Sequence, residues 1–335
     1  MPIHFTEKQR KKDPNMRLSQ LLVIGLALLP LSISESISPA KAEIKLKAAS
    51  FLPARSVYAK YFYRWVDELN THCEGNLKIS IVGPEAVKSL EQWRTLKDGV
   101  IDLHYGPPNY YKGVLAEADV TSLANTSAAE QRANGAWDII NRLHNEKMNA
   151  WYLTHISGGV KFFLYTTKPQ KNGRFEGFRL RSTPIYDDFF RSLGAEPVRM
   201  APPSLYTALE RNTVDGYGWP LWGITDLGWH KHTKYRHGPG FFNAIVNILV
   251  NLDRWDSLLD NQRQCLTDMS IWLERKFPEW RTIENEKQIT AQISAGITYI
   301  DMGTDFPNLA HQIHWDTLMK ENPTIIGTLR NLLVR

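Results

Sequence analysis

The sequence predicts an α/β protein built as two lobes, and three patterns lead to this prediction. Short strands alternate with helices over residues 44–105, which is the order of a parallel sheet with crossover helices. The same order returns over residues 177–217. Helical spacing then continues over residues 260–294, interrupted only at Pro278. One such helix could brace both lobes, and two ordinary helices broken by the proline are an equal alternative.

The first lobe is delimited by its hydrophobic periodicity and its glycines. Residues 77–82 alternate apolar and polar side chains, and Tyr61, Trp65 and Leu69 recur at helical spacing. Ligands of open α/β sheets bind beyond the carboxyl ends of the strands, so Phe51 and the segment from Tyr105 to Asn109 are candidate cleft residues. The elements expected here are strands at 44–50, 77–82 and 100–105 and helices at 57–72, 90–97 and 128–151.

The second lobe repeats this order. Val214-Asp215-Gly216-Tyr217 is expected to end a short strand in a turn. The elements expected are strands at 160–167, 177–181, 196–200 and 214–217 and helices at 186–193, 204–211 and 260–294.

The first 42 residues have the pattern of an export signal. A basic segment that ends at Arg17 precedes an apolar run from Leu18 to Ile33, and the small-residue site Ala40-Lys41-Ala42 follows. The run is short for a bilayer, so we expect cleavage after Ala42, with a retained membrane anchor as the alternative. This segment holds six basic and three acidic residues, so its removal lowers the formal net charge from +5 to about +2. The high pI therefore does not indicate a nucleic-acid partner.

About 290 residues remain, which is enough for two lobes of ordinary size. The best further candidate for a membrane span, residues 241–252, is short and broken by asparagines, so we expect a soluble protein in the periplasm. Cys73 and Cys265 could pair in an oxidising compartment. Two cysteines do not distinguish a bridge from two buried thiols.

Two arginines stand out on the strand expected at 177–181. Arg179 and Arg181 flank Leu180, so alternation points both side chains to the same face. An arginine at a strand end beside a cleft can hold a carboxylate with two parallel hydrogen bonds, which lysine cannot reproduce. A surface pair on an edge strand is the competing interpretation.

Tryptophans gather in the segment that follows. Trp219, Trp222 and Trp229 could form an apolar wall against the carbon skeleton of a ligand. We expect Trp219, between Gly218 and Pro220, to face the cleft, and we favour core packing for the other two.

Chemistry-bearing motifs are otherwise few. His230 and His232 form an H-x-H pattern, but no Cys or acidic residues accompany it, so a solvated loop is favoured over a metal site. No G-x-S-x-G, H-E-x-x-H, P-loop or G-x-G-x-x-G motif occurs, and nothing pairs a nucleophile with a base. We therefore expect no metal and no cofactor.

Four stretches of the second lobe, in their order and spacing, look like the solute-binding subunits of TRAP (tripartite ATP-independent periplasmic) transporters. The resemblance extends over nearly the whole mature chain, more loosely in its first half. The stretches are Gly-Phe-Arg-Leu-Arg-Ser-Thr-Pro at 177–184, Leu-Gly-Ala-Glu-Pro-Val at 193–198, Leu-Tyr-Thr-Ala-Leu-Glu at 205–210 and Val-Asp-Gly at 214–216.

The resemblance implies a two-lobed periplasmic binding protein of the class II type, with mixed sheets, helices on both faces and a long helix bracing the lobes. Such a protein closes on an organic acid and delivers it to a membrane permease driven by an ion gradient. It is not an enzyme and needs no nucleic acid, and a monomer or weak dimer is expected. The implied lobes are 43–158 with 242–290, and 159–241 with 291–335.

The resemblance also assigns roles to residues. In the family, the arginine of a G-x-x-x-R strand holds the carboxylate; the spacing selects Arg181, with Arg179 as second choice, and Lys161 stands where a further arginine is frequent. Trp219 replaces a common asparagine, and Gly218 replaces the acidic residue that precedes such a tryptophan in cation-binding relatives. These departures favour a monocarboxylate with an apolar or aromatic body and no metal.

The sequence thus yields one candidate site and two rival functions. The rivals are an exported hydrolase or lyase that uses Asp215, His155 or His230 as acid and base, and a sensory module that kept the binding fold. In the favoured interpretation, a solute-binding protein, Arg181 orients the carboxylate of the ligand while Trp219 and its neighbours exclude water. The candidate ligand-binding residues are Arg181, Arg179, Trp219, Lys161, Tyr105, Asn109, Phe51 and Trp222.

Overall fold

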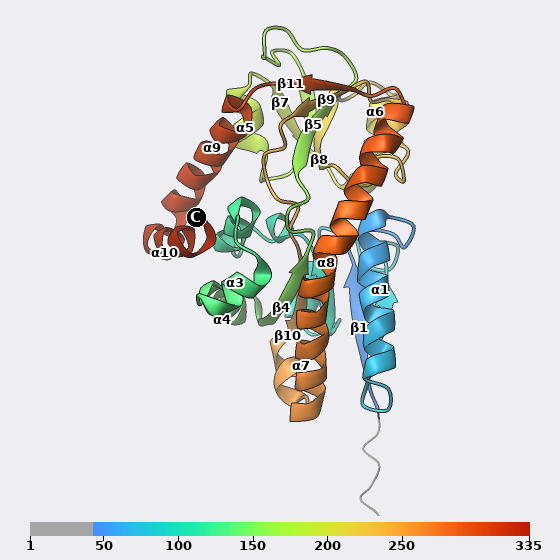
Figure 1. The fold of residues 1–335 in the computed structure, drawn as a ribbon, viewed down its shortest axis with the longest axis vertical. Coiled ribbons are helices and arrows are strands. Elements are labelled where there is room, and N and C mark those ends of the chain that lie inside the picture. The colour runs from blue at the N-terminus through green and yellow to red at the C-terminus, as the bar shows by residue number, and fades with distance from the viewer. Residues whose placement is uncertain (1–42) are drawn as a thin grey trace, which may run out of the picture. The chain divides into compact units, whose positions relative to one another are not determined.

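The structure is a computed structural model that describes residues 43–335, and the predicted export signal lies outside them (Figure 1). The strands are β1 (Ile44–Ser50), β2 (Leu77–Val82), β3 (Leu103–Gly106), β4 (Ala150–Ile156), β5 (Phe162–Thr166), β6 (Arg179–Ser182), β7 (Glu196–Arg199), β8 (Gly216–Pro220), β9 (Tyr235–Gly238), β10 (Val246–Asn251) and β11 (Thr298–Asp301). The helices are α1 (Val57–His72), α2 (Gln92–Lys97), α3 (Ala128–Ala133), α4 (Ala136–Met148), α5 (Asp187–Ser192), α6 (Leu205–Glu210), α7 (Leu252–Ser257), α8 (Asp260–Ser294), α9 (Asp305–Glu321) and α10 (Pro323–Leu333). Short 3-10 helices cover Pro108–Tyr110, Ala116–Leu123, Pro202–Ser204 and Trp229–Lys231.

These strands form two mixed sheets, which confirms the predicted fold class. The first has the order β2-β1-β3-β10-β4, and the second has the order β11-β9-β5-β8-β6-β7. In the first sheet β1 pairs in parallel with β2 and β3, whereas β10 runs antiparallel to β3 and β4. In the second, β6 is parallel to β7 and β8, and β5 is antiparallel to β8 and β9.

The chain passes between the sheets more than once. The first sheet takes its strands from residues 44–156 and 246–251, and the second takes its strands from residues 162–238 and 298–301. Connections at 157–161 and 239–245 therefore join them, and α8 leads back to β11 (Figure 1). The exact lobe boundaries at 158, 241 and 290 remain predictions.

Helix α1 begins and ends where its sequence indicates. The Ser56 side chain caps its start by accepting a hydrogen bond from the Tyr58 amide at 3.3 Å. Tyr61, Trp65 and Leu69 are buried, as their spacing predicts.

Helix α8 is continuous for 35 residues through Pro278, so the single-helix alternative is correct. Its first half packs on α1, where Trp65 Nε1 donates to the Met269 carbonyl at 3.0 Å. Its second half holds the other lobe, because Gln292 Nε2 donates to the Leu221 carbonyl at 2.7 Å. The expectation that one long helix braces both lobes is confirmed.

A disulfide joins Cys73, at the end of α1, to Cys265, near the start of α8. The pairing that the sequence left open is therefore formed. It encloses a sequence separation of 192 residues and ties the two helices together at one end of the molecule.

Two predicted elements differ most from the observed ones, and several others differ by one to three residues at an end. The helix expected over 128–151 is divided into α3 and α4, because Gly135 and Asn149 adopt left-handed backbone conformations with φ of 86° and 48°, and β4 then begins at Ala150. The strand expected to end at Tyr217 instead continues through β8 to Pro220. Its antiparallel pairing with β5 places Trp219 opposite Phe163, in a strand and not in a turn.

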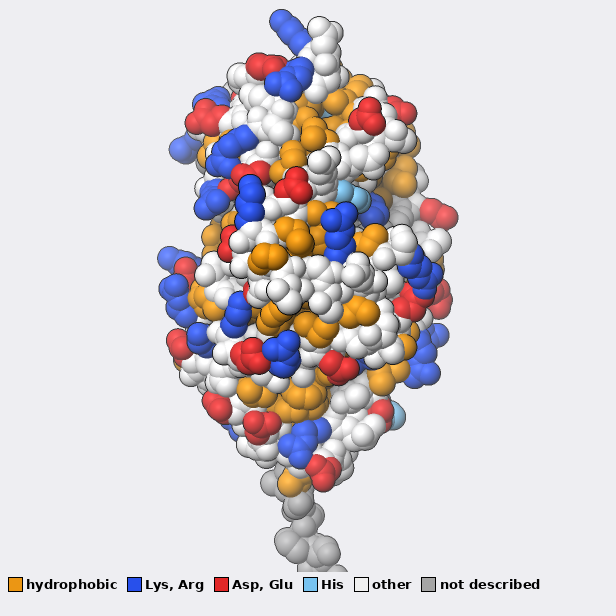
Figure 2. All heavy atoms as spheres, turned by 90° about the vertical axis from the view of Figure 1, so that its left-hand side faces the viewer, with side chains coloured by type: hydrophobic (Ala, Val, Ile, Leu, Met, Phe, Trp, Pro, Cys, Tyr) orange, Lys and Arg blue, Asp and Glu red, His pale blue; other side chains and the backbone are white. Residues whose placement is uncertain are grey.

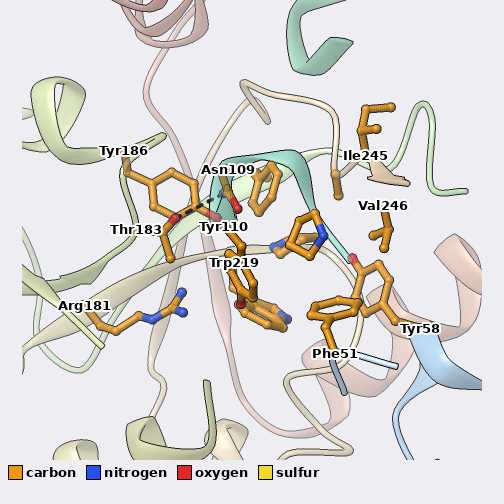
Figure 3. A pocket seen from close by; sticks show the side chains of 14 residues that line it. Phe51, Tyr58, Asn109, Tyr110, Arg181, Thr183, Tyr186, Trp219, Ile245 and Val246 are labelled. Atoms are coloured by element: carbon orange, nitrogen blue, oxygen red, sulfur yellow. Dashed lines mark hydrogen bonds between the residues drawn. The ribbon is translucent and has the colours of Figure 1, made fainter. Parts of the chain in front are cut away.

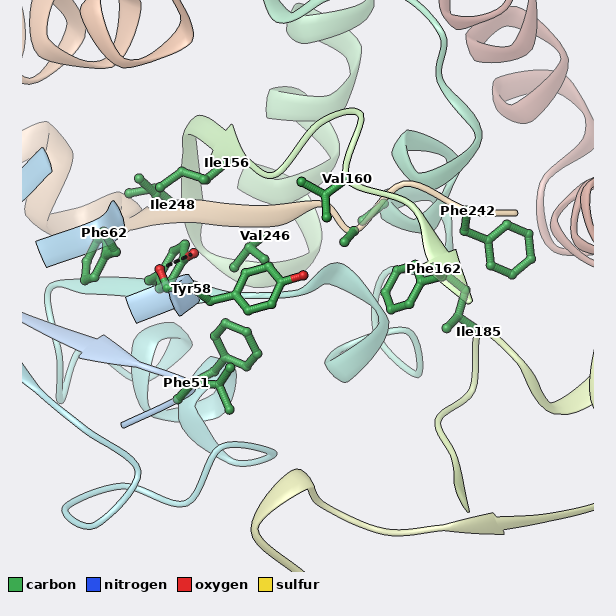
Figure 4. Packing of buried hydrophobic residues seen from close by; sticks show 14 of the residues in the cluster. Phe51, Tyr58, Phe62, Ile156, Val160, Phe162, Ile185, Phe242, Val246 and Ile248 are labelled. Carbon is green, nitrogen blue, oxygen red and sulfur yellow. Dashed lines mark hydrogen bonds between the residues drawn. The ribbon is translucent and has the colours of Figure 1, made fainter. Parts of the chain in front are cut away.

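Buried apolar side chains form one cluster that extends through both sheets. Figure 4 shows Val246 of β10 near Tyr58 of α1, Ile248 of β10 near Ile156, and Phe162 and Phe242 farther along. On the face shown in Figure 2, Lys and Arg side chains are interspersed with Asp and Glu, without a large patch of one sign. Within residues 43–335, no helix combines the length and apolarity needed to cross a bilayer.

Buried histidines make the fold sensitive to acid. Burial lowers the pKa of His104 and of His314 from 6.5 to about 3. Between about pH 6.5 and pH 3 the unfolded chain therefore binds more protons than the folded protein, and the free energy of unfolding falls as the pH falls. We expect each histidine to lower it by up to about 1.4 kcal/mol per pH unit. Urea unfolding at pH 7, 6, 5 and 4 measures this slope, which should flatten in His104→Leu; an unchanged slope would contradict the assignment.

Candidate functional site

A cavity lies where the carboxyl ends of strands from the two sheets meet (Figure 3). Phe51 follows β1, Asn109 follows β3, and Arg181 and Thr183 stand at the end of β6. The cavity holds about 370 Å³ of space outside atoms, a volume that includes space open to solvent. The lining residues are Phe51, Tyr58, Pro107, Asn109, Tyr110, Phe162, Arg181, Thr183, Tyr186, Trp219, Pro220, Ala244, Ile245 and Val246.

Arg181 is the charged residue of this lining, and it is fully buried. Its Nε donates to the Met200 carbonyl at 3.1 Å, and its Nη1 donates to the Gly218 carbonyl at 3.4 Å. Its Cζ lies 5.5 Å from the centre of the Trp219 ring. Within residues 43–335, Nη2 has no hydrogen-bond partner. The guanidinium is thus fixed in orientation and keeps donor capacity for a ligand.

The groups around Arg181 do not neutralise it. Burial raises the pKa of the Tyr110 and Tyr186 hydroxyls above their usual value, although the nearby guanidinium acts in the opposite direction. Both tyrosines are therefore neutral at ordinary pH. A buried cation without a counter-charge is costly, so an anion bound here would offset that cost.

Arg179, the second predicted arginine, does not line the cavity. It stands at the amino end of β6, whereas the cavity lies at the carboxyl end. Its side chain is exposed; Nη2 donates to the Asn212 carbonyl at 2.6 Å, and Nε lies 3.7 Å from Asp215 Oδ2. The alternative of a surface arginine therefore describes Arg179, and Asp215 is engaged by Arg179 and Lys168.

Aromatic rings form the apolar wall. The rings of Phe51 and Tyr58 meet edge to face with centres 6.3 Å apart, and Tyr58 meets Trp219 in the same way at 6.5 Å. Trp219 Nε1 donates to the Trp222 carbonyl at 2.8 Å, so its polar edge is used and its ring carbons remain for a ligand. This places Trp219 in the cleft wall while leaving it only 5% exposed.

Two of the predicted aromatic residues lie behind this wall. The Tyr105 ring is 5.6 Å from Phe51, and its hydroxyl donates to the Tyr58 carbonyl at 3.1 Å. The Trp222 ring is 5.7 Å from Tyr58, and its Nε1 donates to Asn285 Oδ1 at 2.7 Å. Both support residues of the lining but are absent from it.

Neutral polar atoms complete the lining. Asn109 Nδ2 donates to Thr183 Oγ1 at 3.3 Å, which joins the two lobes across the cavity (Figure 3). Within the described chain, Asn109 Oδ1 and the Tyr58 hydroxyl have no hydrogen-bond partner. A ligand could therefore meet an acceptor and a donor besides the guanidinium.

Gly218 allows one wall of the cavity to form. A Cβ atom here would lie 2.9 Å from Phe190 Cζ and 3.1 Å from the Tyr186 ring. The absence of a side chain thus lets Tyr186 pack against β8 and line the cavity. Within residues 43–335, no cluster of three or more His, Cys, Asp or Glu side chains is arranged to hold a metal ion.

Lys161 and the acid–base candidates of the rival enzyme lie elsewhere. Lys161 and His155 line a second, larger cavity, while Asp215 and His230 line neither. The cavity at Arg181 therefore brings together four of the predicted residues, namely Arg181, Trp219, Asn109 and Phe51.

Several lining residues are not predicted from the sequence patterns above. Tyr58 lies three positions before Tyr61, on the face that the helical spacing already marked. Thr183 follows the arginine strand directly. Ile245 and Val246 lie in an apolar run whose local pattern does not indicate a ligand site.

Comparisons with known proteins agree with this architecture. The chain is 22% identical over 293 residues to an uncharacterised protein of Haemophilus influenzae, covering 83% of this chain and 85% of that protein. DctP7 of Bordetella pertussis, an extracytoplasmic solute receptor that binds pyroglutamic acid, superposes with a TM-score of 0.75 at 14% identity, covering 87% of this chain and 99% of that one. A TRAP solute-binding protein from a marine metagenome, specific for aromatic acids and solved with 3-hydroxybenzoate, superposes with a TM-score of 0.73 at 18% identity, covering 87% and 98%.

The family itself follows from the sequence match. The model of the bacterial extracellular solute-binding proteins, family 7 (DctP), matches residues 48–305, which is most of the chain. The solved structures support the two-lobed fold. Because their sequence identities to this chain are low, they support the fold alone. The chain therefore belongs to family 7 of the bacterial extracellular solute-binding proteins, the solute receptors of TRAP transporters.

Proposed function

We propose that this protein captures an organic monocarboxylate outside the cytoplasm, in the cavity at Arg181, and delivers it to an ion-gradient-driven TRAP permease. The observation that carries the proposal is the buried guanidinium whose Nη2 has no partner among residues 43–335. A carboxylate can accept two parallel hydrogen bonds from such a group and supplies the missing charge. Family membership supports the role as a receptor.

The rest of the lining favours an acid with an apolar or aromatic body. Phe51, Trp219 and Ile245 offer ring and aliphatic carbon atoms, with one charged residue among them. The unpartnered Tyr58 hydroxyl and Asn109 Oδ1 suit a hydroxyl or carbonyl group on that body. The marine receptor that binds 3-hydroxybenzoate is a precedent for such a ligand in this fold.

Binding without conversion fits the same geometry better than catalysis does. The acid and base candidates of the rival enzyme, Asp215, His155 and His230, lie outside the lining of this cavity. The family and its structural neighbours are binding proteins. We accordingly place the protein in the periplasm, with the permease as its partner.

A thermal-shift screen of paired compounds tests this proposal. Each monocarboxylate, from pyruvate to 3-hydroxybenzoate, is matched with its primary amide, which keeps the shape but removes the charge. We expect small acids to raise the melting temperature by mass action and their amides to leave it unchanged. Equal shifts from acid and amide would contradict a carboxylate clamp. Recovery of chemically altered ligand after incubation would favour the enzyme.

A further inference from the structure

A second cavity lies beside α8, and Ile245 lines both cavities. It is larger than the first and holds about 1000 Å³ of space outside atoms. Both connections between the sheets contribute to it, together with α3 and the part of α8 around Pro278. Its lining residues are Thr121, Ala124, Asn125, Thr126, Ser127, Ala128, Glu130, Gln131, His155, Gly158, Gly159, Lys161, Asn243, Ile245, Glu274, Phe277, Pro278 and Arg281.

The acidic residues of this lining already have partners. Glu274 accepts hydrogen bonds from Arg132 at 2.7 Å and from the Thr154 hydroxyl at 2.6 Å. Glu130 accepts a hydrogen bond from the Ser127 amide at 2.8 Å and pairs with Arg335. Their negative charges are therefore offset within the protein.

The basic residues are not offset. Arg281 Nη1 donates to the Gly158 carbonyl at 2.9 Å, and no ion pair to Arg281 or Lys161 occurs within residues 43–335. Burial and the positive charge of Arg281 lower the pKa of Lys161. His155 adds no charge, because burial lowers its pKa to about 4. Two like charges thus share one cavity without a counter-charge.

We propose that this cavity is a second binding site, which takes a small oxyanion such as phosphate, sulfate or carboxylate between Lys161 and Arg281. The ammonium group supplies a compact positive charge, and the guanidinium supplies further N–H donors beyond the one bound to Gly158. An anion between the two cations adds two attractions that outweigh their mutual repulsion. Lys161, which the sequence assigned to the carboxylate ligand, thus serves a separate site.

The position of the cavity gives an anion there contact with both lobes. Gly158, Gly159 and Lys161 belong to the first connection between the sheets, and Asn243 belongs to the second. Arg281 belongs to the helix that braces both lobes. The two connections pair directly, because Lys161 and Asn243 form an antiparallel bridge.

Calorimetric titration of the purified protein with inorganic phosphate, in a buffer free of phosphate and sulfate, tests the proposal. We expect one phosphate per chain, with sulfate and acetate competing for it. Lys161→Met and Arg281→Gln should each weaken phosphate binding at least tenfold, whereas Arg181→Ala should leave it unchanged. No binding of any of the three anions at millimolar concentration overturns the proposal, as does phosphate binding that is lost only in Arg181→Ala.

The melting temperature of Lys161→Met shows whether the variant has lost only the anion site or the stability of the fold as well. Without added anion, we expect Lys161→Met to melt at or above the temperature of the unaltered protein, because the variant removes a half-buried ammonium group that has no ion-pair partner within residues 43–335. A lower melting temperature would mean that Lys161 is structural, and would overturn the assignment.

The same variants distinguish failure of this second-site proposal from failure of the proposed function at Arg181. If Lys161→Met abolishes binding of the organic acid and Arg181→Ala does not, the larger cavity is the ligand site and both assignments fail. If Arg181→Ala abolishes binding of the organic acid while phosphate still binds through Lys161, both hold. Failure of phosphate binding alone leaves the cavity at Arg181 as the ligand site.

Discussion

Arg181→Ala is expected to weaken binding of the carboxylate ligand by about 30-fold to several thousand-fold. Removing one partner of a buried charge pair costs about 2–5 kcal/mol, and each 1.4 kcal/mol is a factor of ten. Here the loss should fall toward the upper end, because the guanidinium is fully buried and is the one charged group in the lining. Calorimetric titration with the best acid from the thermal-shift screen measures the change.

The same strand offers a matched control. Arg179→Ala removes an equal charge two residues away but leaves the cavity intact, so affinity should stay within about twofold of the original. Arg181→Lys keeps the charge but loses the planar fork, and we expect it to bind much more weakly than the unaltered protein. Unchanged affinity in Arg181→Ala, or equal losses at the two arginines, would refute the clamp.

The second large effect concerns stability. Replacing Cys73 and Cys265 together by serine should lower the free energy of unfolding by about 2–5 kcal/mol, because the bond closes a very long loop in the unfolded chain. For a folded chain of about 290 residues that corresponds to a melting temperature lower by about 3–8 °C. Differential scanning calorimetry with and without a reductant measures the difference.

Ligand binding provides the control for this double variant. The two cysteines are absent from the lining of both cavities, so affinity at low temperature should be retained. A reductant should lower the melting temperature of the unaltered protein and leave that of the variant unchanged. Equal melting temperatures for the two proteins under oxidising conditions would show that the bond contributes nothing to stability.

The sequence predicts the elements whose patterns are local. Strands β1 and β2 and helix α1 have the predicted bounds, because alternation or helical spacing is complete within each of them. Strand β10 escaped prediction as a strand because all of its residues are buried between β3 and β4, and a strand covered on both faces has no alternation to detect. Strands β9 and β11 escaped because neither of their sequences, Tyr-Arg-His-Gly and Thr-Tyr-Ile-Asp, alternates apolar and polar side chains.

The residues of the candidate site are likewise predictable only in part from the sequence. Strand position and family resemblance lead to Arg181, which the structure places in the cavity. They do not separate Lys161 from its neighbour Phe162, although the former lines the larger cavity and the latter lines the smaller one. Successive side chains of an extended segment point to opposite sides, so one step along the chain changes the cavity. Which cavity lies on which side depends on how the lobes meet, which no local pattern encodes.

The long helix that passes through Pro278 has a mechanical consequence. Proline cannot donate the backbone hydrogen bond that a helix would otherwise form there, which favours bending of α8 at that point. The segment from Pro278 to Ser294 rises about 24 Å, so a rotation of about 10° there would displace its far end by about 4 Å. A ligand enclosed between the lobes presents little surface to another protein. Movement of the helix end would instead make the bound state detectable from outside the protein, because a small change of angle at Pro278 becomes a displacement of several ångströms there.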